Sequence, residues 1–439
     1  MSPFFVKAIQ LLLSLSLLII LHELGHFIPA RLFKTRVEKF FLFFDVKFAL
    51  FKKKIGDTVY GIGWLPLGGY VKISGMIDES MDTEQMQGPP QPWEFRSKPA
   101  WQRLIIMLGG VTVNLLLGFL IYMMVLFVWG KSTLSNDDLL GGFNPSPLAE
   151  TVGFKNGDQI LNVDGQTLEN VLDVNRLLLL RNVKEVTVQG QNGQTRTVQI
   201  PEDFGDQMFQ SGETMPLLPQ YPNRIGSVQP GSPAEQVGLQ ANDQIEALNN
   251  TPIANWSDFI TAIQGQEGAS FSLVIKRDNL LDTLALEPNA EGKIGVLPGG
   301  FDIHFSTRDL SFSESIVEGF GHTYWTLYDY VAQFKYIFTK KGASQLGGFG
   351  TIGNLFPSAW DWRGFWSSTA LISIILAFMN VLPIPALDGG HVMFLLYEML
   401  TGRKPNDKFM EYAQMTGFFL LMALVLYANG NDLIRAIFG

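Results

Sequence analysis

Cysteine is absent from this chain of 439 residues, and charged residues are sparse at 17%. Without cysteine, no part of the fold depends on disulfide bonds, and the sequence carries no redox signal for its compartment. Hydrophobic residues reach 47% and gather into four blocks, at 4–21, 104–129, 366–387 and 412–428. Each block approaches the roughly 20 residues that a helix needs to cross a bilayer, so a membrane protein with about four spans is expected.

The first block has a second interpretation, as a cleavable signal peptide. Lys7 precedes the apolar run, and "FIPA" resembles a small-residue cleavage site. The apolar run is longer than the roughly 7–15 residues of a signal-peptide core. Cleavage would also remove the stretch in which metal-ligand spacing occurs. We therefore interpret this block as the first transmembrane helix.

Charge between the blocks predicts the orientation, because short loops rich in lysine and arginine stay in the cytoplasm. Residues 27–103 carry 12 basic and 8 acidic side chains, and residues 401–411 carry three basic ones. Residues 130–365 carry 15 basic and 27 acidic side chains, which accounts for most of the net charge of −9. The expected topology places both termini and a large acidic region outside the cytoplasm.

The acidic region contains an internal repeat. "SPLAETVGFKNGDQILNVDG" at 146–165 matches "SPAEQVGLQANDQIEALNNT" at 232–251. A helix-like stretch and alternating strands follow each copy, which predicts two small α/β modules. Both resemble PDZ domains, which typically capture an extended segment or a C-terminus as an added strand. A spacer without ligand remains the alternative, because neither copy shows a clear carboxylate-binding loop, and a size filter is a third possibility.

The motif "HELGH" follows the first block directly, and the chain has only five histidines. A spacing of four places His22 and His26 on one face of a helix, where both imidazoles can bind one Zn²⁺. Glu23 lies beside them, in position to take a proton from a metal-bound water. Ionisable side chains at membrane depth cost a few kcal/mol or more each, so a functional role is expected. Two packed histidines without metal are the alternative.

A catalytic zinc site needs a third protein ligand. No Glu or His follows HELGH at the short distance typical of soluble zinc proteases. The next candidate lies in "NVLPIPALDGGH" at 380–391, where prolines interrupt the third block. Asp388 is the preferred ligand, because the adjacent glycines allow a close approach to another helix. His391 remains the competing ligand.

HELGH in a first span, paired with "NVLPIPALDGG" in a later one, resembles the site-2 protease family of intramembrane zinc metalloproteases, and the order of segments resembles its bacterial sigma-E regulating group. The resemblance covers the whole chain. It implies Zn²⁺ held by His22, His26 and Asp388, with Glu23 as the general base. Candidate substrate-binding residues are Asn380, Pro383, Pro385, Gly68, Gly69 and Tyr70.

The segment after the first span alternates apolar and polar residues around a turn at "KKIGD", which predicts strands lying against the membrane. By the resemblance, this sheet offers an edge to the unwound substrate, with Gly68 and Gly69 permitting close backbone approach. An interfacial sheet without substrate contact is the alternative. The family's Gly-Phe-Gly is replaced here by "FFLFFDVKF", and its Gly-Pro in the second span by Gly109-Gly110, which affects the expected substrate handling.

The fold class expected is a multi-span α-helical membrane protein with a membrane-associated β-sheet and two extracytoplasmic α/β PDZ-like domains. The expected segments are 1–36 (first transmembrane helix), 37–103 (cytoplasmic β segment and loop), 104–130 (second transmembrane helix), 131–215 and 216–300 (PDZ-like domains), 301–364 (amphipathic interfacial helix and connector), 365–400 (third transmembrane helix with the LDG motif) and 401–439 (fourth transmembrane helix and tail).

The resemblance implies cleavage of single-span membrane proteins in the bacterial inner membrane, such as trimmed anti-sigma factors and remnant signal peptides. The PDZ-like domains would lie on the periplasmic side, and no nucleic acid is expected as a partner. Two other classes stay open, a non-catalytic membrane adaptor and a zinc-dependent transporter or sensor. The intact HELGH and LDG motifs argue against the first, and a transporter should carry more His and acidic residues over several spans.

Overall fold

The computed structural model describes residues 2–66, 68–76, 88–139, 141–264, 269–289, 292–299 and 305–438. The chain divides into two compact units. The first combines Met1–Gly130 with Asp309–Gly439, and the second is Lys131–Arg308. Residues close to both termini thus belong to one unit, which carries all the predicted membrane-crossing segments.

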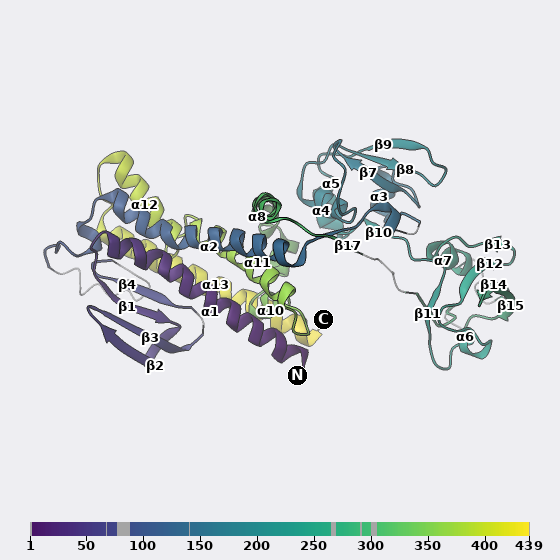
Figure 1. Ribbon diagram of the computed structural model, residues 1–439, viewed down its shortest axis with the longest axis horizontal. Helices are drawn as coiled ribbons and strands as arrows, with labels where there is room; N and C mark the ends of the chain where they lie inside the picture. Colours follow the sequence, from purple (N-terminus) through teal and green to yellow (C-terminus); the bar gives the residue numbers. More distant parts are fainter. Residues whose placement is uncertain are drawn as a thin grey trace. The chain divides into compact units, whose positions relative to one another are not determined.

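Helices dominate the first unit. They are α1 (Pro3–Leu32), α2 (Ala100–Trp129), α8 (Phe312–Ile337), α9 (Lys340–Gln345), α10 (Phe349–Gly353), α11 (Trp362–Val381), α12 (Asp388–Thr401) and α13 (Asp407–Phe438). Among the described residues, four helices are long and apolar enough to cross a membrane: α1, α2, α11 and α13. These correspond to the four predicted blocks. Within this unit both termini lie at the same end, and α12 lies at the other (Figure 1).

The expected third transmembrane segment, 365–400, is two helices. α11 ends at Val381, and α12 begins at Asp388. Pro383 and Pro385 explain the interruption, because proline lacks a backbone N–H and disfavours a helical residue before it. The last span, α13, holds the link between the helices: Ala386 donates its N–H to the Gln414 side chain at 3.3 Å. Asp388 is therefore the first residue of α12 and follows directly after this link.

α8 coincides with the expected amphipathic helix, and a capping box of Ser311 and Glu314 begins it. It packs on the spans through aromatic pairs, with Phe320 on Phe119 of α2 and Phe334 on Phe378 of α11. Phe378 is only two residues from Asn380. The aromatic side chains of α8 therefore pack against α2 and α11, a contact that the expectation of an interfacial helix did not include.

A four-stranded sheet follows α1, in the order β2-β3-β1-β4. Its strands are β1 (Val37–Leu42), β2 (Phe44–Ile55), β3 (Thr58–Leu65) and β4 (Tyr70–Ile73). β1 is parallel to β3 and antiparallel to β4, and β2 forms an antiparallel hairpin with β3. Gly56 allows the tight turn of that hairpin with φ +61°. β2 and β4 are the edges of this sheet.

The second unit contains two α/β modules with separate hydrophobic cores. The first has β6 (Phe143–Pro145), α3 (Pro147–Thr151), β7 (Gln159–Val163), α4 (Asp173–Leu180), β8 (Glu185–Gln189), β9 (Thr195–Gln199), α5 (Phe204–Ser211) and β10 (Leu217–Pro219). The second has β11 (Ile225–Val228), α6 (Pro233–Gln236), β12 (Gln244–Leu248), β13 (Thr251–Pro252), α7 (Trp256–Gln264), β14 (Phe271–Arg277), β15 (Leu280–Leu286) and β16 (Val296–Pro298).

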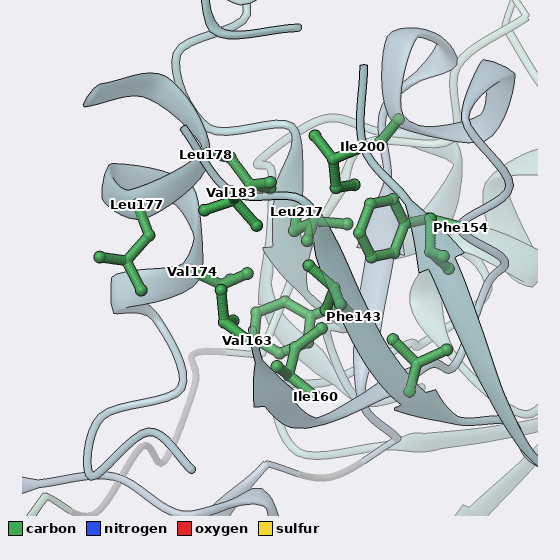
Figure 2. Packing of buried hydrophobic residues seen from close by; sticks show 14 of the residues in the cluster. Phe143, Phe154, Ile160, Val163, Val174, Leu177, Leu178, Val183, Ile200 and Leu217 are labelled. Atoms are coloured by element: carbon green, nitrogen blue, oxygen red, sulfur yellow. The ribbon is translucent and has the colours of Figure 1, made fainter. Parts of the chain in front are cut away.

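The core of the first module corrects the expected boundary at 215. Figure 2 shows Leu217 among the side chains of this core, together with Phe143 and Ile160. Leu217 is fully buried, and its strand β10 pairs with β6. A further pair joins β5 (Lys131–Thr133) to β17 (Ser306–Arg308), so the unit extends past residue 300. The first limit was placed too early because β10, the last strand of the first module, is only three residues long. The second module ends with β16 at Pro298, inside the expected 216–300.

Candidate metal centre

The two histidines of HELGH lie on one face of α1. Their Nε2 atoms are 3.3 Å apart, and the imidazole centroids are separated by 4.8 Å. His26 is buried, and its Nδ1 lies 2.8 Å from the backbone oxygen of Ile106 in α2. A proton on Nδ1 satisfies that contact and leaves the lone pair of Nε2 directed to a metal.

α12 adds Asp388 to the pair. Its Oδ2 lies 3.4 Å from Nε2 of His22 and 3.3 Å from Nε2 of His26. Oδ2 is buried and has no hydrogen-bond partner, although a buried carboxylate oxygen normally has one. In a tetrahedral site with metal–ligand bonds of about 2.0–2.1 Å, two ligand atoms are about 3.3 Å apart. The three side chains therefore fit a zinc ion.

His391, the competing candidate, lies one helical turn beyond Asp388. Among the residues that the structure describes, the only potential metal-binding group of His, Cys, Asp and Glu is His22, His26 and Asp388. His391 lines the cavity beside this cluster without being part of it. The geometry favours Asp388 as the third ligand.

Glycines bring α1 and α2 together at the centre. A Cβ atom on Gly25 would lie 2.4 Å from the backbone oxygen of Gly109. A Cβ atom on Gly110 would lie 2.4 Å from Nε2 of His26 and 2.5 Å from Cε1 of His22. Any larger residue at these positions would separate the helices or displace the imidazoles. The Gly109-Gly110 pair, read above as a departure from the family pattern, thus makes room for the ligands.

Asn114 of α2 completes the surroundings of His22, and sequence reasoning missed it. Its side-chain amide lies 3.1 Å from Nδ1 of His22, and its Oδ1 is buried without a partner. The amide atom at this distance is Nδ2. When Nε2 of His22 binds a metal, Nδ1 carries a proton, and Asn114 accepts that proton through Oδ1 once its amide is turned over. An asparagine inside an apolar span was the available signal, because polar side chains at membrane depth are seldom incidental.

Glu23 lines a cavity of about 360 Å³ that also contains the two histidines, Asp388 and Asn380. Val71 of β4 makes a backbone hydrogen bond to the Glu23 carboxylate. This bond joins the general-base candidate to the edge strand of the sheet. The cavity thus has the cluster on one side and β4 on another.

The predicted substrate-binding residues do not all reach this cavity. Asn380, Gly69 and Tyr70 line it, and the Asn380 amide lies 3.5 Å from Nε2 of His22. Pro383, Pro385 and Gly68 are not among the lining residues. A Cβ atom on Gly68 would lie 2.9 Å from the Phe44 ring, and one on Gly69 would lie 2.5 Å from Ile19. Both glycines are therefore required by packing within the protein itself.

Comparison with known proteins places the chain in a family. The model of peptidase family M50 matches residues 10–424. A putative zinc metalloprotease of Neisseria meningitidis is 27% identical, over 98% of this chain and 98% of its own. The regulator of sigma E protease of Haemophilus influenzae is 28% identical, over 97% and 98%, and the protease RseP of Yersinia pestis is 28% identical, over 97% of each chain. This chain belongs to peptidase family M50, and its predicted place among the site-2 metalloproteases is confirmed.

Proposed function

We propose that this protein cleaves single-span membrane proteins inside the bilayer, with zinc held by His22, His26 and Asp388. The observation that carries the proposal is the buried Oδ2 of Asp388, which has no donor and faces two imidazole nitrogens at tetrahedral spacing. His22 and His26 come from α1 and Asp388 comes from α12, and 366 positions separate His22 from Asp388 in the sequence. Zinc matches this donor set of two nitrogens and one oxygen, which supports a metal ion as the group that all three side chains bind.

Zinc, when bound, polarises a peptide carbonyl and makes water a stronger acid. Glu23 then accepts the proton of the attacking water and transfers it to the leaving amine. The Val71 backbone bond holds the Glu23 carboxylate in place for both steps. Asn380, beside His22 in the same cavity, is placed to donate a hydrogen bond to the substrate backbone.

The edge of the sheet gives the substrate a place to unwind. In a transmembrane helix the backbone carbonyl groups accept hydrogen bonds from N–H groups of the same helix. Such a helix is a poor substrate until other donors replace these hydrogen bonds. β4 pairs with β1 on one side only, and its residues, together with the preceding Gly69, line the cavity. An extended substrate segment added along this edge would replace its helical hydrogen bonds with bonds to the sheet.

Substrates of the anti-sigma factor type, already trimmed outside the membrane, fit this reaction, and so do remnant signal peptides. Two relatives are named as regulators of sigma E or as RseP, which favours the first class. The acidic modules would then lie on the periplasmic side of the inner membrane, as the charge distribution predicts. The reaction proposed here is compatible with both roles of these modules, the capture of peptides as in PDZ domains and the exclusion of bulky substrates.

The test uses the full-length protein, purified and returned to lipid vesicles, with a single-span substrate and a zinc determination. Wild-type protein should contain about one zinc per chain and cut the substrate within its transmembrane segment. Glu23→Gln is the matched control: it should retain zinc, because Glu23 is not a ligand, and lose at least about a hundredfold in rate. Zinc without cleavage by wild type would instead favour a transporter or sensor, and absence of both would favour an adaptor.

A further inference from the structure

Three stacked rings lie in the sheet, and two of them, Phe44 and Tyr70, line the cavity. Tyr70 of β4 lies between Phe41 of β1, with centroids 5.5 Å apart and planes at 16°, and Phe44 of β2, at 6.1 Å and 13°. Phe41 is buried. The ring of Tyr70 is thus held by two stacked neighbours at the lining of the cavity.

The hydroxyl of Tyr70 is hydrogen-bonded to the carboxylate of Asp45. Tyr70 donates its O–H to Oδ1 of Asp45 at 2.8 Å, and Lys39 donates to the same tyrosine oxygen at 3.1 Å. The Lys39 ammonium also lies 3.5 Å from Oδ2 of Asp45. All three residues line the catalytic cavity. Asp45 is therefore oriented by two neighbours and presented to whatever occupies the cavity.

Asp45 retains the capacity to bind another donor. A carboxylate has about four lone-pair positions, and the contacts to Tyr70 and Lys39 use two of them. The Asp45 side chain is 25% exposed, so its remaining acceptor sites are reachable. Lys72, the other lysine of this wall, is paired with Glu38 at 3.7 Å. The catalytic base and the metal ligands are separate groups, so the proton transfers described above leave Asp45 unused.

We propose that Asp45 is a specificity-determining residue, which accepts a hydrogen bond from a donor side chain of the substrate close to the cleaved bond. An amide, hydroxyl or ammonium group would be favoured at that substrate position, and a carboxylate would be repelled. Tyr70 and Lys39 are positioning residues that hold the Asp45 carboxylate. This inference rests on the proposed proteolysis, since it concerns which segment that same cavity accepts.

The experiment compares substrate pairs that differ only in glutamine or glutamate, which are nearly equal in shape. The pair is moved one position at a time through the residues flanking the cleaved bond of a single-span substrate. At one position wild-type protein should prefer glutamine by about tenfold or more in kcat/KM, the size expected for a hydrogen bond to a charged group. Asp45→Asn should remove most of this preference, and Asp45→Lys should invert it.

Two further variants isolate the effect. Asp57→Asn removes an equal charge from the β2–β3 turn, outside the cavity lining, and should keep the wild-type ratio. Tyr70→Phe keeps the ring stack but removes the hydroxyl that orients Asp45, and should lower the ratio in part. Because each readout is a ratio for one protein, it is independent of the amount of folded enzyme, and retained zinc confirms an intact centre.

An equal loss for both substrates in Asp45→Asn, with the ratio unchanged, would show that Asp45 only supports the wall and would overturn the inference. Absence of a glutamine preference in wild type at every position would do the same. If wild-type protein binds zinc but cuts no substrate of the series, the proposed proteolysis and this inference both fail. If it cuts the substrates without a glutamine preference, only this inference fails.

Discussion

The unit with the four membrane-crossing helices, called here the membrane unit, and the second unit, Lys131–Arg308, each contain aspartates with buried carboxylate oxygens, and the surroundings of these oxygens differ. In the two modules of the second unit, Asp158 accepts the N–H of Lys155 at 2.7 Å and pairs with Arg196, and Asp243 accepts the N–H of Gln240 at 2.9 Å. Asp243 also pairs with the Arg277 fork, at 2.7 Å for each contact. In the membrane unit, Asp388 has an oxygen with no donor. Buried acceptors are normally satisfied, so Asp158 and Asp243 stabilise local structure, whereas the unpartnered Oδ2 of Asp388 indicates a ligand.

The two modules reach the same arrangement independently. Arg196 also donates to the carbonyl of Gly153, and Arg277 donates to the carbonyl of Gly238, the equivalent glycine in the repeat. In each module the arginine thus connects the loop after the short helix to a strand of the sheet. The aspartates that appeared in the repeat are explained by folding, and they need no function in binding.

The largest effect should come from Asp388→Asn. Removing the charged ligand leaves two histidines, so zinc affinity should fall by at least about a hundredfold, and cleavage should fall with it. His391→Ala is the control on the same helix and should leave zinc content near normal. Metal analysis of both purified variants decides the assignment. Reversed results would make His391 the third ligand.

Asp243→Asn should act on stability and leave the metal untouched. The change breaks one half of a bidentate pair whose carboxylate side chain is only 1% exposed. Loss of a buried charged hydrogen bond should lower the free energy of unfolding of the second module by about 2–3 kcal/mol, because Arg277 remains partly hydrated. Hydrogen exchange of the β12 and β14 amides in the full-length protein measures it, with zinc content as the control. Zinc loss in this variant would contradict the division into structural and ligand-binding aspartates.

The motifs of the centre could be read from the sequence because ligand spacing within one helix is local. His22, Glu23 and His26 follow from helical periodicity, and the proline interruption before Asp388 follows from the chemistry of proline. The resemblance to a known family then linked the two motifs. Packing of α2 could not be predicted in the same way, since the need for glycine at 109 and 110 arises only when α1 lies against that face.

Module boundaries and side-chain networks were also beyond the sequence. β10 and β17 are short strands whose pairing partners are 70 or more positions away, so no local pattern identifies them. Asp45 looked like one polar residue in an alternating strand, and only the arrangement of β1, β2 and β4 brings it to Tyr70 and Lys39. Such contacts depend on tertiary structure, which periodicity does not encode.

Asn114→Ala gives a smaller effect at the centre. Loss of the group that orients His22 should reduce zinc affinity by about tenfold to a hundredfold while all three ligands remain. Ser14→Ala is the matched control, because Ser14 is also a buried polar residue without a partner, in α1 but eight positions from His22. Zinc titration of both variants tests whether zinc affinity depends on a polar side chain next to His22 or on any unpartnered polar side chain in a span. Equal affinities for the two variants would remove Asn114 from the centre.

The smallest effect on the free energy of unfolding is expected for Asp158→Asn. Its comparison with Asp243→Asn tests whether the two aspartate–arginine pairs are equally important for stability. Burial raises the pKa of the Asp158 carboxyl, although the Lys155 N–H and Arg196 act in the opposite direction. Desolvation therefore outweighs the partners, and a neutral isostere loses little when it replaces the ionised side chain. Arg196 contacts one oxygen of Asp158, whereas Arg277 contacts both oxygens of Asp243. Unfolding of the first module, followed by exchange of the β7 and β8 amides, should change by less than about 1 kcal/mol. A cost equal to that of Asp243→Asn would show that the two pairs are equivalent and that the fork geometry makes no difference.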